Sequence, residues 1–451
     1  MTFNSINPYN NQIVGTYEGI SDDELTNKLD KSYVAFQSWK KVSLVDRSEL
    51  MRKAGQVLRD NVEEYARMIT LEMGKPISES KGEINKCAWV CDYYAENAQD
   101  FLSDEVIKTD AQKSFVKHDP IGAVLAIMPW NFPFWQVFRF AAPTLMAGNV
   151  GLLKHAPNVF GCAIQMEEVF TKAGFPDGVF QNLIVHHDRT ETIISHQAVK
   201  AISLTGSERA GAAVAEIAGR HIKKSLLELG GNNAFIVWED ADIDKVIETA
   251  LVARMLNCGQ SCIAAKRFIL LDGIYDEFVE KFTNAISALP DGDPLKESTK
   301  VGPMARIDLA NQLQKQVQGS VSQGAELLLG GNQRNCYHEP TILGNVKPGM
   351  PAFDEETFGP LAAMIRAKDI DEAFMLSGMS PFGLGVTVCT RDIDKAVSMA
   401  DRVTDGAYFV NELVKSDPRL PFGGTKRSGY GRELAKDGMM EFVNRKTVYV
   451  K

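Results

Sequence analysis

Residues 121–154 read IGAVLAIMPWNFPFWQVFRFAAPTLMAGNVGLLK, and this stretch decides the class of fold. Residues 123–128 form a short apolar run that predicts a buried strand, and residues 149–154 predict a second one. Residues 133–146, between them, have the length and composition of a helix. Short apolar strands joined by helices indicate a parallel, doubly wound sheet. Ligands of such sheets bind beyond the carboxyl ends of the strands, so we expect functional residues directly after them.

The same alternation extends through the rest of the chain. Helices are predicted over residues 158–173 and 209–218, and extended segments over 179–185 and 201–204. Upstream, apolar residues at three-to-four spacing predict a layer of helices over residues 22–39, 44–61, 62–73 and 78–101. A second α/β region follows residues 233–237 and runs to about residue 435. The predicted fold class is therefore α/β with two doubly wound regions.

Composition excludes several kinds of partner. A net charge of −9 argues against a nucleic-acid partner, which favours a basic surface. The 7 cysteines are scattered through 451 residues and form no disulfide framework, so we expect a reducing, cytoplasmic setting. The C-x3-C pairs at 87/91 and 258/262 lack the second half of a zinc site, so no metal is expected. Within the uncharged run at residues 120–138, Pro129 and Pro133 would break a membrane helix, so no membrane partner is expected.

Residues 257–262, Asn-Cys-Gly-Gln-Ser-Cys, contain the candidate nucleophile. Gly259 allows a tight turn, after which backbone N–H groups can face the sulfur of Cys262. Amide dipoles in a partly dry pocket favour the thiolate over the thiol. The alternative is a buried, inert cysteine, which is the more common fate of an intracellular cysteine.

The ends of the predicted strands suit a dinucleotide. Lys154 closes a strand and can reach a ribose hydroxyl or a phosphate, whereas His155 is expected to be a structural histidine. The segment Thr205-Gly206-Ser207 leads into a helix whose free N–H groups can bind a pyrophosphate. Ser207 has an alternative role as the N-cap of that helix.

Two acidic residues are further candidates. Glu228 ends an apolar strand before Gly230 and Gly231, and a desolvated glutamate with a raised pKa can act as a general base. The alternative for Glu228 is a strand-end acid that faces solvent. Glu356 lies in an acidic turn over residues 353–360 that is suited to hold a ribose.

These motifs, in this order, resemble the NAD(P)-dependent aldehyde dehydrogenase superfamily. The resemblance runs from about residue 7 to the C-terminus and rests on the motifs PWNFP at 129–133, Lys154, TGS at 205–207, ELGG at 228–231, GQSC at 259–262, ETFGP at 356–360 and PFGG at 421–424. It implies that Cys262 is the nucleophile, Glu228 the base and Asn131 the amide of the oxyanion hole. It also implies a set of cofactor contacts: Trp130, Lys154, Thr205, Gly206, Ser207, Gly231, Glu356 and Phe358.

The resemblance implies oxidation of an aldehyde to a carboxylic acid. The Cys262 thiolate attacks the aldehyde carbon, a hydride leaves for the nicotinamide, and Glu228 activates the water that hydrolyses the thioester. Relatives that transfer the acyl group to coenzyme A commonly lack this glutamate, so Glu228 favours hydrolysis. Some relatives are structural proteins without activity, but a chain with nucleophile, base and oxyanion amide together argues against that alternative.

One position bears on the cofactor. Many relatives that prefer NAD carry a glutamate at the place of Pro157, where it binds the ribose hydroxyls and repels a 2′-phosphate. Without that acid NADP is not excluded, and we expect use of NADP, NAD or both.

The spacing of residues along the predicted helix after Asn131 indicates which side chains contact the substrate. Phe132, Gln136 and Arg139 are four and three residues apart and share one helix face beside Asn131. A buried arginine is costly unless it meets an anion, which is either the substrate or an acid of a neighbouring loop or subunit. By resemblance to the short bacterial succinate semialdehyde dehydrogenases, Arg139 holds the distal carboxylate of the substrate. The other pocket residues expected are Ser261, Ile263, Ser416 and Phe422.

One departure weakens that substrate assignment. Many succinate semialdehyde dehydrogenases carry a second arginine where this chain has Leu256, whereas Arg254 lies two residues earlier and can point elsewhere. Lys415 or Arg419 is a candidate to compensate. A broader range of semialdehydes, hydroxyaldehydes such as lactaldehyde, or aliphatic aldehydes is the alternative.

The resemblance also implies the domain organisation and assembly. Residues 1–108 and 122–230 are expected to form a Rossmann-like cofactor-binding domain, and residues 231–435 a catalytic domain. Residues 109–121 and 436–451 are expected to form a β arm that joins subunits into a homodimer or homotetramer.

Overall fold

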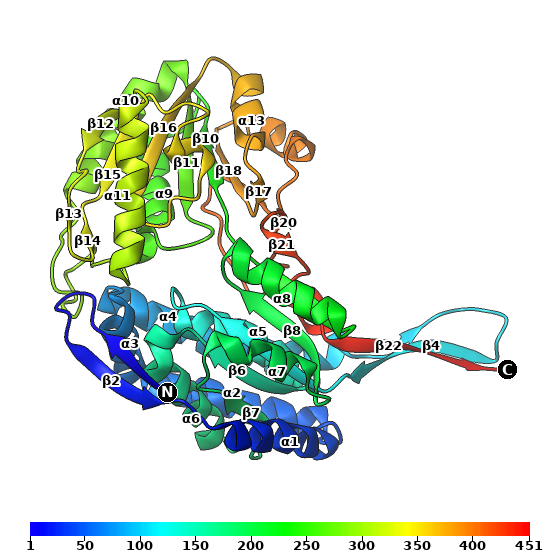
Figure 1. Ribbon diagram of the computed structural model, residues 1–451. Coiled ribbons are helices and arrows are strands. Elements are labelled where there is room, and N and C mark those ends of the chain that lie inside the picture. The colour runs from blue at the N-terminus through cyan, green and yellow to red at the C-terminus, as the bar shows by residue number, and fades with distance from the viewer.

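The computed structural model describes residues 1–451, the whole of the printed sequence. The molecule consists of two lobes and a projecting arm (Figure 1). The lower lobe contains a six-stranded sheet, the upper lobe a seven-stranded sheet, and the arm a three-stranded sheet. The predicted fold class, two doubly wound α/β regions with a small β arm, is confirmed.

The lower sheet is built around the strands predicted from residues 121–154. Its strand order is β21-β9-β8-β5-β6-β7, with β21 antiparallel to β9 and all other pairs parallel. The chain moves outward from β5 to β7 and then returns to β8 on the other side of β5. The strand order thus reverses between β5 and β8, which is where ligands of doubly wound sheets bind. The strands are β5 (Ala123–Met128), β6 (Val150–His155), β7 (Phe180–Asn182), β8 (Val199–Thr205), β9 (Lys224–Glu228) and β21 (Gly429–Tyr430).

Helices cover the lower sheet as the apolar spacing predicted. Ser21 and Ser43 cap the first two helices, because each side chain accepts a hydrogen bond from a backbone N–H of the first turn. Gly74, with φ of 80°, ends the third helix in the left-handed conformation that glycine adopts readily. The helices are α1 (Asp22–Trp39), α2 (Leu44–Asp60), α3 (Val62–Met73), α4 (Ile77–Phe101), α5 (Pro133–Met146), α6 (Phe160–Lys172), α7 (Thr190–Ser195) and α8 (Glu208–Arg220).

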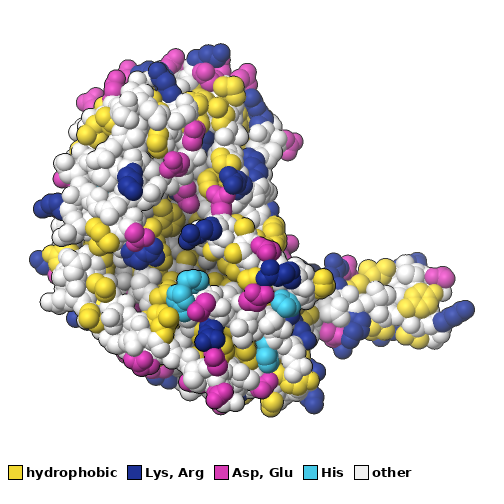
Figure 2. Space-filling view, in the orientation of Figure 1, with side chains coloured by type: hydrophobic (Ala, Val, Ile, Leu, Met, Phe, Trp, Pro, Cys, Tyr) yellow, Lys and Arg dark blue, Asp and Glu magenta, His cyan; other side chains and the backbone are white.

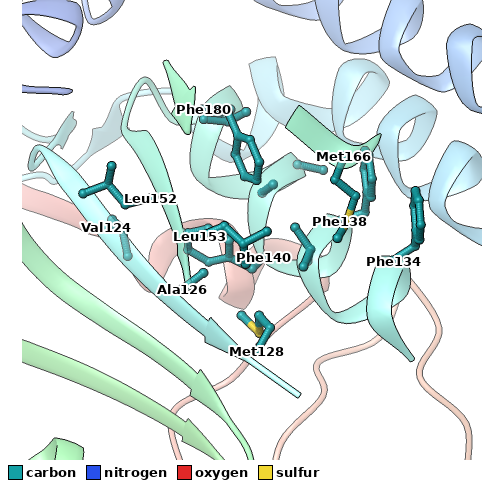
Figure 3. Packing of buried hydrophobic residues seen from close by; sticks show 14 of the residues in the cluster. Val124, Ala126, Met128, Phe134, Phe138, Phe140, Leu152, Leu153, Met166 and Phe180 are labelled. Atoms are coloured by element: carbon teal, nitrogen blue, oxygen red, sulfur yellow. The ribbon is translucent and has the colours of Figure 1, made fainter. Parts of the chain in front are cut away.

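Helix α5 lies inside the lower lobe, and all 14 of its residues are buried. Its phenylalanines pack beside apolar residues of β5, β6, β7 and α6, as the labelled residues Phe134, Phe138 and Phe140 show (Figure 3). A helix buried on every side is normally apolar all round. Gln136 and Arg139 break this pattern, so their polar groups require partners inside the protein.

The upper lobe has helices on both faces of its sheet. The strand order is β12-β15-β16-β11-β10-β18-β19, parallel except for β12 against β15. Alternate residues of β10 enter two separate cores, Ala234 and Ile236 on one side and Phe235 and Val237 on the other. The elements are β10 (Asn233–Val237), β11 (Ala265–Leu271), β12 (Glu326–Leu329), β15 (Thr341–Gly344), β16 (Leu361–Ala367), β18 (Val386–Cys389), β19 (Tyr408–Val410), α9 (Ile243–Met255), α10 (Asp272–Ser287), α11 (Ile307–Ser322) and α13 (Ile370–Gly378).

The arm joins two segments that are far apart in sequence. Strand β22 (Val443–Val450) pairs antiparallel with β4 (Lys113–Pro120), as the resemblance implied, and β3 (Glu105–Val106) adds a short third strand. The arm projects from the body of the molecule (Figure 1). The exact domain boundaries proposed from the sequence stay a prediction.

The remaining elements are short. They are β1 (Thr2–Ile6), β2 (Ile13–Glu18), β13 (Gln333–Arg334), β14 (Tyr337–His338), β17 (Phe382–Gly383), β20 (Thr425–Lys426), α12 (Pro351–Asp354), α14 (Ile393–Ser398) and α15 (Ala435–Met440). None of the helices combines the length and the apolar character needed to cross a membrane.

Candidate active site

Two cavities meet at Cys262. The first, of about 370 Å³, lies beyond the ends of β5 and β8, where the strand order reverses. The second, of about 260 Å³, lies between α4, α5, the loop before β11 and residues 413–416. Cys262 lines both cavities, so a group bound in either one can reach its sulfur. Hydrophobic side chains gather in the hollow between the two lobes (Figure 2).

The loop that carries Cys262 has an unusual backbone. Asn257 and Cys258 adopt left-handed conformations, with φ of 55° and 53°, which are costly for residues other than glycine. The backbone N–H of Asn257 donates to Glu79 Oε2 at 2.6 Å, and its side-chain amide donates to the carbonyl oxygen of Asn131 at 2.7 Å. These hydrogen bonds hold the loop in place against both α4 and the end of β5.

Gly259 completes the same turn, as the sequence predicted. Its φ is 73°, and a Cβ atom there would lie 2.3 Å from both the Arg254 guanidinium and the carbonyl oxygen of Gly359. Arg254 is fully buried and donates to the carbonyl oxygens of Gly259 at 2.7 Å, Gly359 at 2.6 Å and Ala265 at 2.9 Å. Arg254 therefore supports the loop and points away from the second cavity.

The electrostatic prediction for Cys262 is wrong for this conformation. No backbone N–H donates to its sulfur, and burial raises the pKa of the thiol to about 11. The positive charges of Lys266 and Arg139 act in the opposite direction but do not overcome burial. The Lys266 ammonium is directed at main-chain oxygens, donating to Ser261 at 2.7 Å and to Cys262 at 2.6 Å. At neutral pH the sulfur is thus held as a thiol that needs a base to become nucleophilic.

Asn131 lies directly after β5 and is fixed from two sides. Its side-chain amide donates to the carbonyl oxygen of Gln260 at 3.1 Å, next to the nucleophile loop. Glu83 of α4 accepts hydrogen bonds at 2.9 Å from the backbone N–H groups of Phe134 and Trp135, in the first turn of α5. A carboxylate at a helix N-terminus is favourable, so Glu83 fixes the start of α5 just after Asn131. Asn131 lines the first cavity together with Cys262.

Glu228 is buried, so the alternative of a solvent-facing acid is wrong. Burial first, and then the nearby Glu433 carboxylate, raise the pKa of Glu228 well above its ordinary value. Its side chain lines neither cavity, and its Oε1 has no hydrogen-bond partner. Oε1 lies where a Cβ on Gly423 would be only 2.8 Å away. In this conformation the Glu228 side chain is turned toward the Gly423 loop.

Most of the predicted cofactor contacts gather in the first cavity. Ser207 also caps α8, because its hydroxyl accepts the Ala210 N–H at 3.3 Å, so both expected roles are compatible. Gly231 does not line the cavity, but its N–H donates to Glu356 Oε1 at 2.9 Å and so orients that carboxylate. The predicted residues that do line the cavity are Trp130, Thr205, Gly206, Ser207, Glu356 and Phe358.

Two neighbouring residues at the end of β6 differ in role. Lys154 is buried, and its ammonium has neither a hydrogen-bond nor an ion-pair partner in the structure. A buried, unpartnered cation at this edge of the sheet fits the ribose or phosphate of a nucleotide. His155 is the structural histidine expected, since its ring nitrogens contact the carbonyl oxygens of Met128 and Pro133, each at 3.1 Å. Burial lowers the pKa of His155 to about 4, which keeps it neutral.

All seven predicted substrate residues line the second cavity. They are Phe132, Gln136, Arg139, Ser261, Ile263, Ser416 and Phe422. Helix α4, predicted only as part of the helical layer, also contributes to this cavity. Its residues at positions 79, 82, 83 and 86 form one face of the cavity. Their three-to-four spacing with three charged side chains was the signal available in the sequence.

Arg139 does not have the free charge that the substrate assignment requires. Its Nε lies 2.5 Å from Glu433 Oε2, its Nη2 donates to Thr205 at 3.2 Å, and its guanidinium lies over the Phe422 ring. The anion that this buried arginine needs is therefore supplied by the chain itself. This is the alternative left open above, an ion pair to another loop.

The two other candidate cations also form ion pairs within the protein. Lys415 pairs with Glu412 at 2.8 Å, and Arg419 pairs with Asp417 at 2.7 Å. Neither compensates for Leu256, which lines the cavity as an apolar residue. The expectation that Lys415 or Arg419 replaces the second arginine is not supported.

Comparison with known proteins agrees with this geometry. The profile of the Aldehyde dehydrogenase family matches residues 1–448. The chain belongs to the aldehyde dehydrogenase family. The resemblance identified from the sequence motifs is thus confirmed.

Several family members are similar along their full length. A probable NADP+ succinate-semialdehyde dehydrogenase of Synechocystis is 46% identical over 453 residues, covering 100% of both chains. An NAD(P)+ succinate semialdehyde dehydrogenase of Escherichia coli is 45% identical, covering 99% of this chain and 97% of its own. The crystal structure of succinic semialdehyde dehydrogenase from Streptococcus pyogenes with NADP+ superposes with a TM-score of 0.97 at 35% identity, covering 99% of both chains.

The raised pKa of Cys262 predicts how the free thiol reacts. Because only the thiolate is nucleophilic, alkylation by iodoacetamide should accelerate about tenfold per pH unit between pH 7 and 9. Mass spectrometry should locate the adduct at Cys262, since the other six cysteines are buried. A rate that stops rising near pH 7 would show that the thiolate is already stabilised, and Cys262→Ser provides the blank.

Proposed function

We propose that the protein oxidises succinic semialdehyde to succinate, with NADP or NAD as the oxidant. The observation that carries the proposal is the position of Cys262 at the junction of the two cavities. The first lies where a doubly wound sheet binds a nucleotide, and the second is small and partly apolar. Pockets that hold drug-sized ligands measure about 300–1,000 Å³, so a cavity of about 260 Å³ favours a short aldehyde.

The chemistry assigned to the chain begins with Cys262. Its thiol first loses its proton to solvent, and the sulfur then attacks the aldehyde carbon. A C–S bond forms as the carbonyl π bond breaks, and the oxygen becomes an oxyanion that the Asn131 side-chain amide stabilises. One oxyanion donor of this kind typically contributes about 10²–10³ in rate. A nicotinamide, when bound, would supply the acceptor for the hydride, and the acyl group would then remain on the Cys262 sulfur as a thioester. Glu228 then takes a proton from the water that hydrolyses the thioester, for which its side chain must turn from the Gly423 loop toward Cys262.

The residues present fit a dinucleotide in the first cavity. The unpartnered Lys154 ammonium and the N-terminus of α8 would hold its ribose and phosphates, and Glu356 the nicotinamide ribose. Pro157 stands where many NAD-preferring relatives have a glutamate, so the chain has no carboxylate at that position to repel a 2′-phosphate. The names of the relatives from Synechocystis and Escherichia coli give NADP+ and NAD(P)+ respectively.

We choose succinic semialdehyde for two reasons. The relatives are named for it, and the second cavity is lined by the cationic residues Lys86, Arg139 and Lys415. A specific observation favours a second candidate, because apolar Leu256 lines the cavity where many such enzymes have an arginine. A broader semialdehyde or hydroxyaldehyde range, including lactaldehyde, is therefore the alternative function.

All seven cysteines are free thiols, which suits a reducing compartment, and we propose the cytoplasm.

The proposed activity is tested by following NAD(P)H absorbance with succinic semialdehyde, lactaldehyde and butanal, each with NADP and with NAD. Succinic semialdehyde should give the highest kcat/KM. Cys262→Ala should abolish turnover while leaving NADP binding, measured by calorimetry, close to that of the wild type. A higher kcat/KM for lactaldehyde or butanal would favour the alternative, and substantial turnover by Cys262→Ala would exclude Cys262 as the nucleophile.

The assignment of Glu228 predicts a change in the time course. Glu228→Gln keeps the size of the side chain but removes the base, so thioester hydrolysis should slow more than thioester formation. Stopped-flow absorbance should then show a burst of about one NAD(P)H per active site before a slow steady state. Disappearance of the burst itself would place Glu228 earlier in the reaction, as the base for Cys262.

We also propose that the arm joins subunits into a homodimer or homotetramer. Strand β22 lies at the edge of the arm sheet, so one row of its backbone groups is unpaired. Apolar side chains at the arm are exposed, including Val106, which is 77% exposed, and Tyr449, which is 51% exposed. Light scattering at micromolar concentration should give two or four times the mass of one chain, and the mass of one chain would contradict the proposal.

A further inference from the structure

The wall of the second cavity contains one cation that no carboxylate of the chain neutralises. Arg139 is paired with Glu433 and Lys415 with Glu412. Lys86 of α4 also lines the cavity, yet no carboxylate oxygen lies within 4.0 Å of its ammonium. Among the cations of this wall, Lys86 alone is available to an anionic ligand.

The contacts of Lys86 hold it in position without neutralising it. Its Nζ donates to Ser416 Oγ at 3.0 Å and lies 4.2 Å from the centre of the Trp135 ring. The indole N–H of Trp135 also donates to Ser416 Oγ, at 2.9 Å. Ser416 thus accepts two hydrogen bonds, and its own O–H has no acceptor in the protein. The ammonium has three N–H groups and uses one of them in a hydrogen bond.

The surroundings make this ammonium unfavourable without a ligand. Burial first, and then the positive charge of Arg139, lower the pKa of Lys86 to about 8. The nearby acids are already engaged, since Glu83 pairs with Lys75 and Asp417 with Arg419. An unpaired charge in a partly dry site is costly, and a carboxylate brought in by a ligand would remove that cost.

We propose that Lys86, together with the hydroxyl of Ser416, binds the distal carboxylate of the substrate, and that Arg139 does not. This rests on the proposed function, because it identifies the group that selects a carboxylate-bearing aldehyde. The carboxylate accepts one hydrogen bond from the Lys86 ammonium and one from the Ser416 hydroxyl. Cys262 lines the same cavity, so the aldehyde end of a short chain lies at the sulfur while its carboxylate lies at α4.

Arg139 has a different role in this arrangement. Its charge neutralises Glu433, and Glu433 in turn acts on the pKa of Glu228. Removing Arg139 leaves a buried carboxylate unpaired beside the general base. Its loss should therefore impair the oxidation of every aldehyde, whatever group the substrate carries at its far end.

The test compares two four-carbon aldehydes, succinic semialdehyde and uncharged butanal, by kcat/KM. Lys86→Met, which keeps length and apolar bulk, should lower the ratio of succinic semialdehyde to butanal by about 10- to 100-fold. Lys86→Arg should retain much of the ratio, because it keeps the charge. Lys81→Met is the matched control, since Lys81 lies on the same helix but pairs with Glu63 and Glu297 outside the cavity.

Three kinetic outcomes separate the possibilities. A fall in the ratio with Lys86→Met, and equal losses on both aldehydes with Arg139→Met, supports the proposal. An unchanged ratio with Lys86→Met overturns it. A selective loss of succinic semialdehyde with Arg139→Met would return the carboxylate to Arg139.

The pH dependence gives a second kinetic readout. In the wild type, KM for succinic semialdehyde should rise as pH passes above about 8, where the Lys86 ammonium loses its proton, and KM for butanal should not. Glu79 also lines the cavity, and burial raises its pKa to about 7, so its ionisation produces a separate change at lower pH. Lys86→Met should remove the change near pH 8 and keep the one near pH 7. Persistence of the higher change without Lys86 would contradict the proposal.

A binding measurement keeps this inference separate from the proposed function. Calorimetry with succinate and uncharged butyramide as probes needs no turnover, and the wild type should bind succinate more tightly than butyramide by a factor that Lys86→Met removes. If the wild type prefers butanal in turnover yet binds succinate through Lys86, the proposed function fails and the anion site stands. If it prefers succinic semialdehyde and Lys86→Met keeps that preference, the function stands and the site fails. Equal binding of succinate and butyramide by the wild type overturns the site directly.

Discussion

The hydrogen bonds that Glu83 accepts from the first turn of α5 determine the geometry on which the active site depends. They fasten α4 to the start of a helix whose residues are all buried. That start positions Asn131, which lines the first cavity, Arg139, which lines the second, and Gln136, which lines both. Lys75 neutralises Glu83. The Lys75 ammonium also lies over the ring of Phe132, which lines the second cavity. A shift of Glu83 would move the cofactor side and the substrate side of the site together.

Buried charges are matched closely around this centre. Arg254 is satisfied by main-chain carbonyl oxygens, Lys266 by carbonyl oxygens near Cys262, and Arg139 by Glu433. Against this background a cation without a counter-charge is informative. Lys154 at the end of β6 and Lys86 in the second cavity are such cations, and each lies where the proposed chemistry brings an anion or a polar ligand. The protein thus distinguishes charges that support its fold from charges that face ligands.

The elements of the fold were predictable from local sequence, because strand and helix periodicity depends on residues that are close along the chain. The helix at residues 22–39 and the strand at 123–128 have the predicted bounds. The motif residues gathered as expected, since parallel strands bring their carboxyl ends to one edge. The pairing of Arg139 with Glu433 was not predictable from spacing, because these residues are 294 positions apart and meet only through the returning C-terminal segment. The pKa of Cys262 was mispredicted for a related reason: it depends on how completely distant segments exclude water, which the hexapeptide does not encode.

The arm places the two ends of the chain in very different surroundings. Val450 pairs with Lys113 at the outer end of the β4–β22 ladder, so the C-terminus lies at the tip of the arm, whereas the N-terminus lies on the body of the lower lobe (Figure 1). A ladder of 8 residues reaches about 27 Å at the usual rise per residue. An affinity tag or fluorescent protein fused after Lys451 would therefore be displayed far from the two cavities but directly beside the exposed strand edge. The same fusion at Met1 would leave that edge uncovered, which makes the N-terminus the better attachment point for surface immobilisation.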